Sequence, residues 1–330
     1  MPRLHKIIRT LFYVGTFWTI AVIMDAFLWK NNDGILLRQT ENMLEDRQKQ
    51  VASFCAGHSE EILHEPSHPM LDGVFVADHK RKFLCALNFK VASSSLLQKM
   101  LLSSGNIPEK EIPLLANAHV DKKWKLEKYG LSVVSTKDKK FINRYQSYFK
   151  FMFVRNPYHR LLSAYRYWFC VENCGLRLGF VNPDESFWNK VYYITRTFGS
   201  NKINPKSKPN GMAVTFEEFL RYVLEDVRRY NTTDDHWKPL YRLSMPCLLK
   251  YNFIGKLETF NQDLYVLMRH IGVVRTPEVH FKPAPIDTTS NVFKEFWTQI
   301  PQDLLKKVQE VYEKDFDLFG YNKSLYEYFS

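Results

Sequence analysis

Residues 151–163 read FMFVRNPYHRLLS, in which an apolar run is followed by Arg155, Pro157 and a stretch of mixed polarity. The apolar run predicts a buried strand. Proline suits the first turn of the helix that follows, because its missing N–H has no partner there in any case. Ligands of open α/β sheets bind at the carboxyl ends of strands, so Arg155 is expected to bind an anion. A structural ion pair is the alternative role for this arginine.

A similar junction lies earlier in the chain, where FKVASSS at 89–95 follows the strand-like run KFLCALNF at 82–89. In chain order this is the first junction, and the one at 151–163 is the second. Lys90 supplies a positive charge, and the small residues after it let a helix N-terminus approach an anion closely. The lysine comes first and glycine is absent, so this is not the glycine-rich phosphate loop of nucleotide triphosphatases. An ordinary helix cap is the alternative for this motif alone. Two anion-binding sites at the ends of neighbouring strands would suit one ligand that carries phosphates at both ends of a nucleoside.

The rest of the chain alternates short apolar runs with longer helical ones, as parallel α/β folds do. Thr215 and Glu218 have the spacing of a capping box. The patterns predict strands at 82–89, 149–154 and 251–258, and helices at 96–105, 158–169, 215–227, 260–272 and 301–321. We therefore predict an α/β fold, a single P-loop-like domain with a central parallel sheet flanked by helices.

Composition and the N-terminus restrict the partners and the compartment. With 330 residues, 45% of them apolar, the chain can form one large domain, and its net charge of +11 predicts an anionic ligand. A merely basic surface is the alternative. Residues 11–29 are apolar apart from Asp25, which is close to the ~20 residues that a bilayer requires, and basic residues precede them. The positive-inside rule then predicts a signal-anchor with a cytosolic N-terminus rather than a cleaved signal peptide.

We accordingly predict a cytosolic tail at 1–10, a signal-anchor transmembrane helix at 11–29, a partly helical lumenal stem at 30–75 and a folded domain at 76–330. An ordered helical arm is the alternative for the stem. Sequons at Asn231 and Asn322 agree with lumenal exposure. An odd number of cysteines in an oxidising lumen leaves at least one without a partner in the chain. These cysteines are Cys55, Cys85, Cys170, Cys174 and Cys247, and their spacing predicts no metal site.

Both junctions, taken together, resemble the paired motifs of Golgi carbohydrate sulfotransferases. The similarity is to the branch that contains chondroitin 4-O-sulfotransferases and the sulfotransferase of the human natural killer epitope. Three later segments are similar to that branch in the same order, so the resemblance covers residues 82 to 321. The segments are HWKPLYRLSMPC, YNFIGKLETFNQD and VYEKDFDLFGY.

The resemblance implies the fold of a sulfotransferase, a catalytic domain at 76–330 and the donor 3′-phosphoadenosine 5′-phosphosulfate, without a metal. Lys90 and the backbone and hydroxyls of the loop after it would hold the 5′-phosphosulfate, and Arg155 and Ser163 the 3′-phosphate. The remaining residues of the second junction are counted with this site. The donor-binding residues are then Lys90, Val91, Ala92, Ser93, Ser94, Ser95, Arg155, Asn156, Pro157, Arg160 and Ser163.

This sequence departs from the family pattern at three positions. Phe89 stands where the family usually has proline, so the entry of the first loop can differ. Ser244 stands where it usually has cysteine, so no disulfide of Cys247 can be carried over. Ser93 stands where relatives often have cysteine, a change that should not harm phosphate binding.

Sulfuryl transfer needs positioned charge more than covalent chemistry. Lys90 is expected to neutralise charge on the leaving oxygen, and a base must take the proton of the acceptor hydroxyl. His236, in DDHWKP, is the first candidate for the base and His119 the rival, although a structural role is open for either. Trp237 is expected either in the core or as a platform for a sugar.

The acceptor is expected to be an acidic polysaccharide, such as a glycosaminoglycan, rather than nucleic acid. Lysines at 122–140 exceed what a donor needs, and a solvated face is the alternative. A nucleotide-dependent kinase is not favoured, because this chain lacks the glycine-rich loop of that class. A catalytically inactive, membrane-tethered glycan-binding protein could share every motif. We expect loops at 175–213 to choose the acceptor, and the implied location is the Golgi membrane, as a single-pass type II protein with a lumenal catalytic domain.

Overall fold

The computed structural model describes most of the folded domain. The described residues are 37–58, 74–103, 107, 123–136, 140–169, 185–199, 214–229, 233–272 and 291–328. The predicted tail at 1–10 and signal-anchor at 11–29 lie outside them, as do His119, Cys170, Cys174 and Asn231. Within the described ranges, no helix has the length and hydropathy needed to cross a membrane.

A five-stranded sheet forms the centre of the domain, in the order β3-β1-β2-β4-β5. Its strands are β1 (Phe75–Asp78), β2 (Phe83–Ala86), β3 (Leu131–Val134), β4 (Phe149–Val154) and β5 (Phe253–Lys256). The strands β2, β4 and β5 are parallel neighbours, with Phe83 opposite Phe149 and Phe151 opposite Phe253. Three strands that the sequence predicts are therefore present. β2 and β4 lie in the middle of the sheet and β5 at its edge, and nearly all apolar side chains of the three are buried.

The prediction of a parallel sheet is only partly correct, because β1 runs antiparallel to both β2 and β3. A parallel connection needs a crossover of a dozen or more residues, whereas only residues 79–82 lie between β1 and β2. The carboxylate of Asp78 accepts hydrogen bonds from the backbone N–H groups of Lys80 and Arg81, at 2.9 and 2.8 Å. This contact closes the tight turn, so the short hairpin determines the mixed topology.

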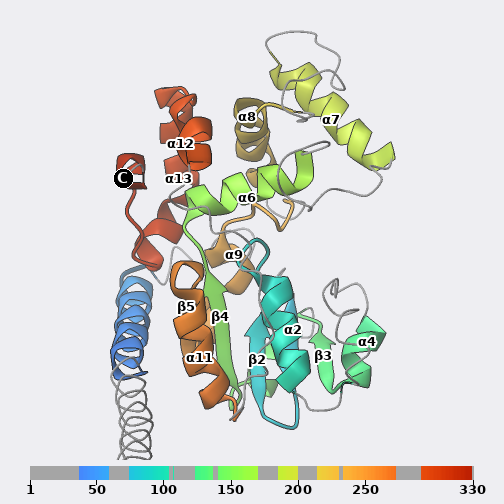
Figure 1. Cartoon of the computed structure of the whole chain (residues 1–330), viewed down its shortest axis with the longest axis vertical. Coiled ribbons are helices and arrows are strands. Elements are labelled where there is room, and N and C mark those ends of the chain that lie inside the picture. The colour runs from blue at the N-terminus through green and yellow to red at the C-terminus, as the bar shows by residue number, and fades with distance from the viewer. Residues whose placement is uncertain are drawn as a thin grey trace, which may run out of the picture. The chain divides into compact units, whose positions relative to one another are not determined.

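Helices lie over the sheet and beyond its strand ends. Figure 1 shows α2 (Ser93–Ser103) and α11 (Phe260–His270) on the viewer's side of the strands, and α6 (Pro157–Phe169) beyond the carboxyl end of β4. Near α6 lie α7 (Glu185–Phe198), α8 (Phe216–Val227), α12 (Asn291–Thr298) and α13 (Gln302–Leu318). The shorter helices are α4 (Lys123–Lys128), α5 (Phe141–Arg144), α9 (Leu240–Ser244), α10 (Pro246–Leu249), η5 (Leu257–Thr259) and η6 (Leu325–Tyr328).

The helices beyond the strand ends form an apolar core of their own. It contains aromatic side chains from α6, α8 and α12, and Trp237 and Trp297 are almost completely buried in it. The capping box that the sequence predicts at Thr215 and Glu218 is present at the start of α8. The helix α7 was not expected, because residues 175–213 were interpreted as loops; its buried Phe187, Val191 and Ile194 have the spacing of one helical face.

Part of the predicted stem packs on the domain. Residues 37–58 form a helix, and the guanidinium of Arg47 lies 2.6 Å from the carboxylate of the fully buried Asp263 and 3.2 Å from the carbonyl of Ile254. Cys55 forms a disulfide with Cys247, 192 residues later. Cys85 is a buried free thiol. Residues 47–58 are thus an ordered arm attached to β5 and α10, which was the alternative to a loose stem.

Candidate active site

The loop between β2 and α2 holds Lys90 in an unusual backbone conformation. Lys90 and Ala92 have φ values of 65° and 63°, in the left-handed region. Neither is glycine, so each costs about 1–2 kcal/mol that the surrounding structure must offset. The loop leads directly into α2 at Ser93, and the first N–H groups of a helix have no partner within the helix. The backbone therefore presents donors beside the lysine, as an anion site requires.

The loop between β4 and α6 is held by side chains on both sides. The side chain of Asn156 accepts hydrogen bonds from the N–H groups of Tyr158 and His159, at 2.9 and 3.4 Å, and so caps α6. The backbone N–H of Asn156 donates to the carboxylate of Glu258 at 2.9 Å, and Glu258 also accepts from the hydroxyl of Tyr321 at 3.0 Å. Pro157 is the first residue of α6, as the sequence predicts.

The two junctions meet through Arg155. One of its terminal nitrogens donates to the carbonyl of Lys90 at 3.2 Å. Burial, together with the charges of Arg155 and Arg160, lowers the pKa of Lys90 to about 7. Burial also lowers the pKa of Arg155 to about 10, although Glu258 acts in the opposite direction. Lys90, Arg155 and Arg160 are three cations in a largely buried position at the strand ends. A bound anion would stabilise their charged forms.

Arg160 has a structural part in this cluster. Its guanidinium donates to three main-chain carbonyls, those of Phe89, Lys238 and Asp235, at 3.1, 2.7 and 2.8 Å. The side chain is 2% exposed. It thereby ties α6 to the first junction and to the segment 233–239, and its charge adds to the field at Lys90. Ser163 lies further along α6 and is partly buried.

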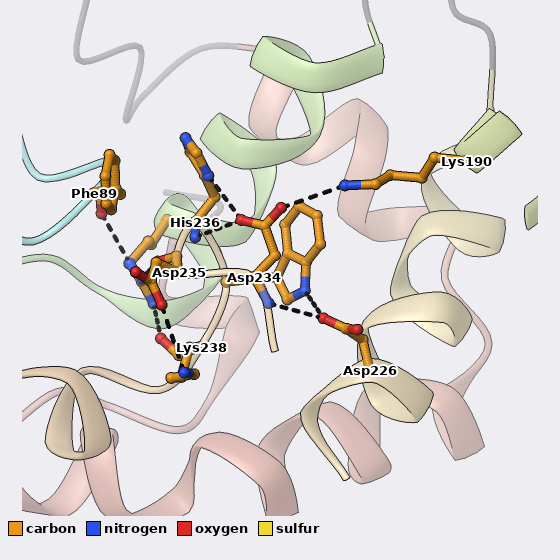
Figure 2. Close-up of polar contacts among 9 residues, drawn as sticks. Phe89, Lys190, Asp226, Asp234, Asp235, His236 and Lys238 are labelled. Atoms are coloured by element: carbon orange, nitrogen blue, oxygen red, sulfur yellow. Dashed lines mark hydrogen bonds and ion pairs between the residues drawn. The ribbon is translucent and has the colours of Figure 1, made fainter. Parts of the chain in front are cut away.

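Next to the first junction, His236 and Asp234 form a hydrogen-bonded pair. The Nδ1 atom of His236 lies 2.8 Å from a carboxylate oxygen of Asp234, and the same oxygen accepts from the His236 backbone N–H at 3.0 Å. Lys190 of α7 reaches the other oxygen at 3.4 Å. Figure 2 shows the imidazole between Phe89 and Asp234, with its far edge turned away from the carboxylate. Asp234 thus engages the Nδ1 edge of the imidazole.

Aromatic rings enclose the imidazole of His236 and connect it to Lys90. The centroids of Phe89, Trp168 and Tyr167 lie 4.6, 5.2 and 5.6 Å from that of the imidazole, and the Tyr167 ring is nearly parallel to it. The Nζ atom of Lys90 lies 4.0 Å from the centroid of Tyr167. Tyr167 therefore contacts both the candidate base and the lysine of the first junction. Phe89 packs on the imidazole of this candidate base.

The structure brings most of the sequence candidates together, but not all of them. Trp237 is fully buried, with its indole N–H donating to Asp226 at 2.8 Å, so it belongs to the core rather than to a sugar platform. His119 lies outside the described residues. A third histidine, His159, is a poor base, because burial and the charge of Arg155 lower its pKa to about 3.

Sequence reasoning missed four residues around the site: Tyr167, Asp234, Lys190 and Glu258. Only Asp234 had a readable signal, since it lies two residues before His236 in the same motif. Tyr167 lies on α6 with Arg160 and Ser163, whereas Lys190 and Glu258 come from distant segments. The contacts of all three depend on how α6, α7 and η5 pack. Among the described residues, no group of three or more histidine, cysteine or acidic side chains has the geometry of a metal site.

This chain is similar to known proteins over most of its length. The sequence profile of the sulfotransferase family matches residues 72–322. A protein named carbohydrate sulfotransferase 12 from Xenopus laevis is 28% identical over 319 residues, covering 89% of this chain and 71% of that protein. Carbohydrate sulfotransferase 14 from Danio rerio is 33% identical over 260 residues, covering 76% of this chain and 63% of that protein. No solved structure matches the chain significantly.

Proposed function

Since the chain belongs to the sulfotransferase family, we propose that it transfers a sulfuryl group from 3′-phosphoadenosine 5′-phosphosulfate to a hydroxyl group of a glycan. The supporting observation is the pair of strand-end cations, Lys90 and Arg155, joined by a hydrogen bond and placed beside the His236–Asp234 pair. The names of the relatives, carbohydrate sulfotransferases, support a sugar acceptor.

The donor fits the residues that are present. Lys90, the backbone N–H groups of 91–95 and the hydroxyls of the three serines would hold the 5′-phosphosulfate at the start of α2. Arg155 and Ser163, together with the capped turn of Asn156 and Pro157, would hold the 3′-phosphate. A guanidinium binds a phosphate through two parallel hydrogen bonds. Because burial and two arginines lower the pKa of Lys90 to about 7, a bound dianion would restore its proton and its charge.

The donor supplies an activated sulfuryl group, and the chain's own residues position it and move one proton. The acceptor oxygen forms a bond to sulfur while the bond from sulfur to the bridging oxygen breaks. The electron pair of that bond stays on the 5′-phosphate, where Lys90 neutralises the charge. The proton of the acceptor hydroxyl goes to Nε2 of His236. The products are the sulfate ester and adenosine 3′,5′-bisphosphate.

The acceptor and the location belong to the same proposal. A net charge of +11 favours an acidic polysaccharide such as chondroitin or a related glycan. The apolar segment at 11–29 and the disulfide between Cys55 and Cys247 support a lumenal domain on a Golgi membrane anchor, since disulfides persist in oxidising compartments. The site needs no metal in this scheme.

The test is turnover by the purified full-length chain. It is incubated with the donor and, separately, with chondroitin, dermatan, heparan and a neutral glycan. Release of adenosine 3′,5′-bisphosphate is followed, and mass spectrometry of disaccharides locates the new sulfate. We expect release that depends on an acidic glycan. Tight binding of glycan and bisphosphate without release from any acceptor would instead indicate the catalytically inactive glycan-binding protein.

A further inference from the structure

We propose that Asp234 is a positioning residue for His236: it holds the imidazole proton on Nδ1 and leaves Nε2 free to accept the proton of the acceptor hydroxyl. This inference rests on the proposed function for its chemistry. Its first support is geometric, because one carboxylate oxygen of Asp234 accepts two hydrogen bonds from His236, from Nδ1 at 2.8 Å and from the backbone N–H at 3.0 Å.

Asp234 is itself held in place from two other elements. Its backbone N–H donates to the carboxylate of Asp226 in α8 at 3.1 Å, and the indole of Trp237 donates to the same Asp226 oxygen at 2.8 Å. Lys190 of α7 lies 3.4 Å from the second oxygen of Asp234. Figure 2 shows this sequence of contacts running from Asp226 through Asp234 to His236. Because both the backbone and the carboxylate of Asp234 are held in place, the carboxylate can fix the orientation of the imidazole ring bonded to it.

The aromatic neighbours cannot do this alone. Phe89 and Tyr167 pack against the imidazole, at centroid distances of 4.6 and 5.6 Å. Such contacts hold the plane of the ring, but they do not distinguish one ring nitrogen from the other. Only a hydrogen-bond acceptor on one edge selects the tautomer. Asp234 supplies that acceptor, so the rings and the carboxylate have complementary roles.

The carboxylate remains ionised where the enzyme is expected to work. Burial by itself would raise the pKa of Asp234, but the hydrogen bonds from His236 and the charge of Lys190 outweigh it and hold the pKa below its usual range. An ionised partner stabilises the imidazolium that forms when Nε2 takes the proton.

Several other charged groups surround this pair. Lys90 contacts Tyr167, which in turn packs on His236. Arg160 of α6 interacts electrostatically with both Asp234 and Asp235, and Asp226 faces the pair from α8. The cations oppose protonation of His236 and the carboxylates favour it, so removal of Asp234 shifts the balance toward the neutral ring.

The experiment replaces Asp234 with asparagine in the full-length chain, with Asp235→Asn as the matched control. The control removes the same charge from the next residue, whose carboxylate pairs with Lys238 at 3.5 Å, and leaves the contact with His236 intact. We expect Asp234→Asn to lower kcat by about 10²-fold or more. The acidic limb of the kcat/KM profile should move to lower pH, because the imidazolium loses its counter-charge. Binding of adenosine 3′,5′-bisphosphate should change less than threefold.

Several results would overturn the proposal. These are a kcat for Asp234→Asn within threefold of wild type, a loss of rate without a shift of the acidic limb, or an equal loss in Asp235→Asn.

A second measurement does not depend on turnover. Selective ¹⁵N-histidine labelling, with the His236 signals assigned by their absence in His236→Gln, reports which ring nitrogen carries the proton. We expect the Nδ1-protonated tautomer in the wild-type chain. The Nε2-protonated tautomer in the wild type would overturn the proposal even if Asp234→Asn failed to fold. A wild-type chain that shows the expected tautomer but no turnover would reject the proposed function alone.

Discussion

The junction after β2 and the junction after β4 follow the same order of strand, cation and helix, yet they are held in different ways. The first has two residues in the left-handed region, Lys90 and Ala92, and a lysine whose pKa is lowered to about 7. The second has a helix cap by Asn156 and a carboxylate from Glu258 on its backbone. The first junction therefore holds a lysine whose charge depends on its surroundings, whereas hydrogen bonds from side chains fix the backbone of the second.

The largest expected effect comes from Lys90→Ala, which removes the cation of the first junction and leaves the second intact. Loss of one preorganised donor at the leaving oxygen typically lowers kcat by about 10²- to 10³-fold. The measurement is release of adenosine 3′,5′-bisphosphate with the preferred acceptor. The control is Lys306→Ala, at an exposed position on α13. Activity of Lys90→Ala within threefold of wild type would show that the first junction takes no part in the reaction.

The second junction is expected to depend on the arm at 47–58. Arg47 reaches Asp263 at 2.6 Å and Thr259 at 3.0 Å, close to Glu258. Arg47→Ala leaves a buried carboxylate without this cation, so we expect a loss of about 3 kcal/mol of stability. That corresponds to roughly 6–12 °C in Tm. Thermal unfolding measures it, with the exposed Lys49→Ala as control. An unchanged Tm would show that the arm does not brace the domain.

The pH dependence of ligand binding should separate the two junctions. Because the pKa of Lys90 is lowered to about 7, the free protein has lost half of this charge at that pH. A bound anion raises the pKa, so binding takes up a proton above pH 7 and the affinity falls as pH rises. We expect adenosine 3′,5′-bisphosphate to bind roughly fivefold more weakly at pH 8 than at pH 7. Calorimetry in buffers of different ionisation enthalpy measures the proton. Lys90→Arg should abolish this pH dependence. If the affinity of that variant still falls as pH rises, a group other than Lys90 causes the effect.

The smallest expected effect concerns the acceptor, which we expect to lie outside both junctions. Exposed lysine contacts are screened beyond a Debye length of about 8 Å at physiological salt. The KM for a long acidic acceptor should therefore rise severalfold between roughly 50 and 300 mM NaCl, while affinity for the enclosed donor changes less. A neutral acceptor of the same length is the control. Equal salt sensitivity for both acceptors would favour a basic surface without a glycan partner.

The sequence predicted the local elements well, because their signals are local. The apolar run of β4, Pro157 at the start of α6 and the capping box of Thr215 and Glu218 all lie where the patterns indicate. The antiparallel β1 was missed, because four apolar and acidic residues before a turn give little periodicity. The contacts Cys55–Cys247 and Arg47–Asp263 join residues about 200 positions apart, which spacing alone does not reveal.

Motifs in the sequence select the candidate residues Lys90, Arg155 and His236, whose roles remain a proposal. The contacts between them could not be predicted, because the bond from Arg155 to the Lys90 carbonyl and the Tyr167 ring between Lys90 and His236 depend on packing. Arg160 shows most clearly that a motif does not reveal which partner a side chain binds. Its place in the motif indicated an anion ligand, but its guanidinium binds three carbonyls of the protein itself.

The central claim is that the two junctions bind opposite ends of one donor. It is tested most directly by calorimetry with two ligands, adenosine 3′,5′-bisphosphate and adenosine 5′-monophosphate, which lacks the 3′-phosphate. Arg155→Lys keeps the charge but loses the two-pronged contact. We predict that it weakens binding of the bisphosphate several-fold and leaves the monophosphate unchanged, whereas Lys90→Ala weakens both ligands by the same factor. An equal loss of both ligands in Arg155→Lys, or unchanged binding of both in Lys90→Ala, would contradict the claim.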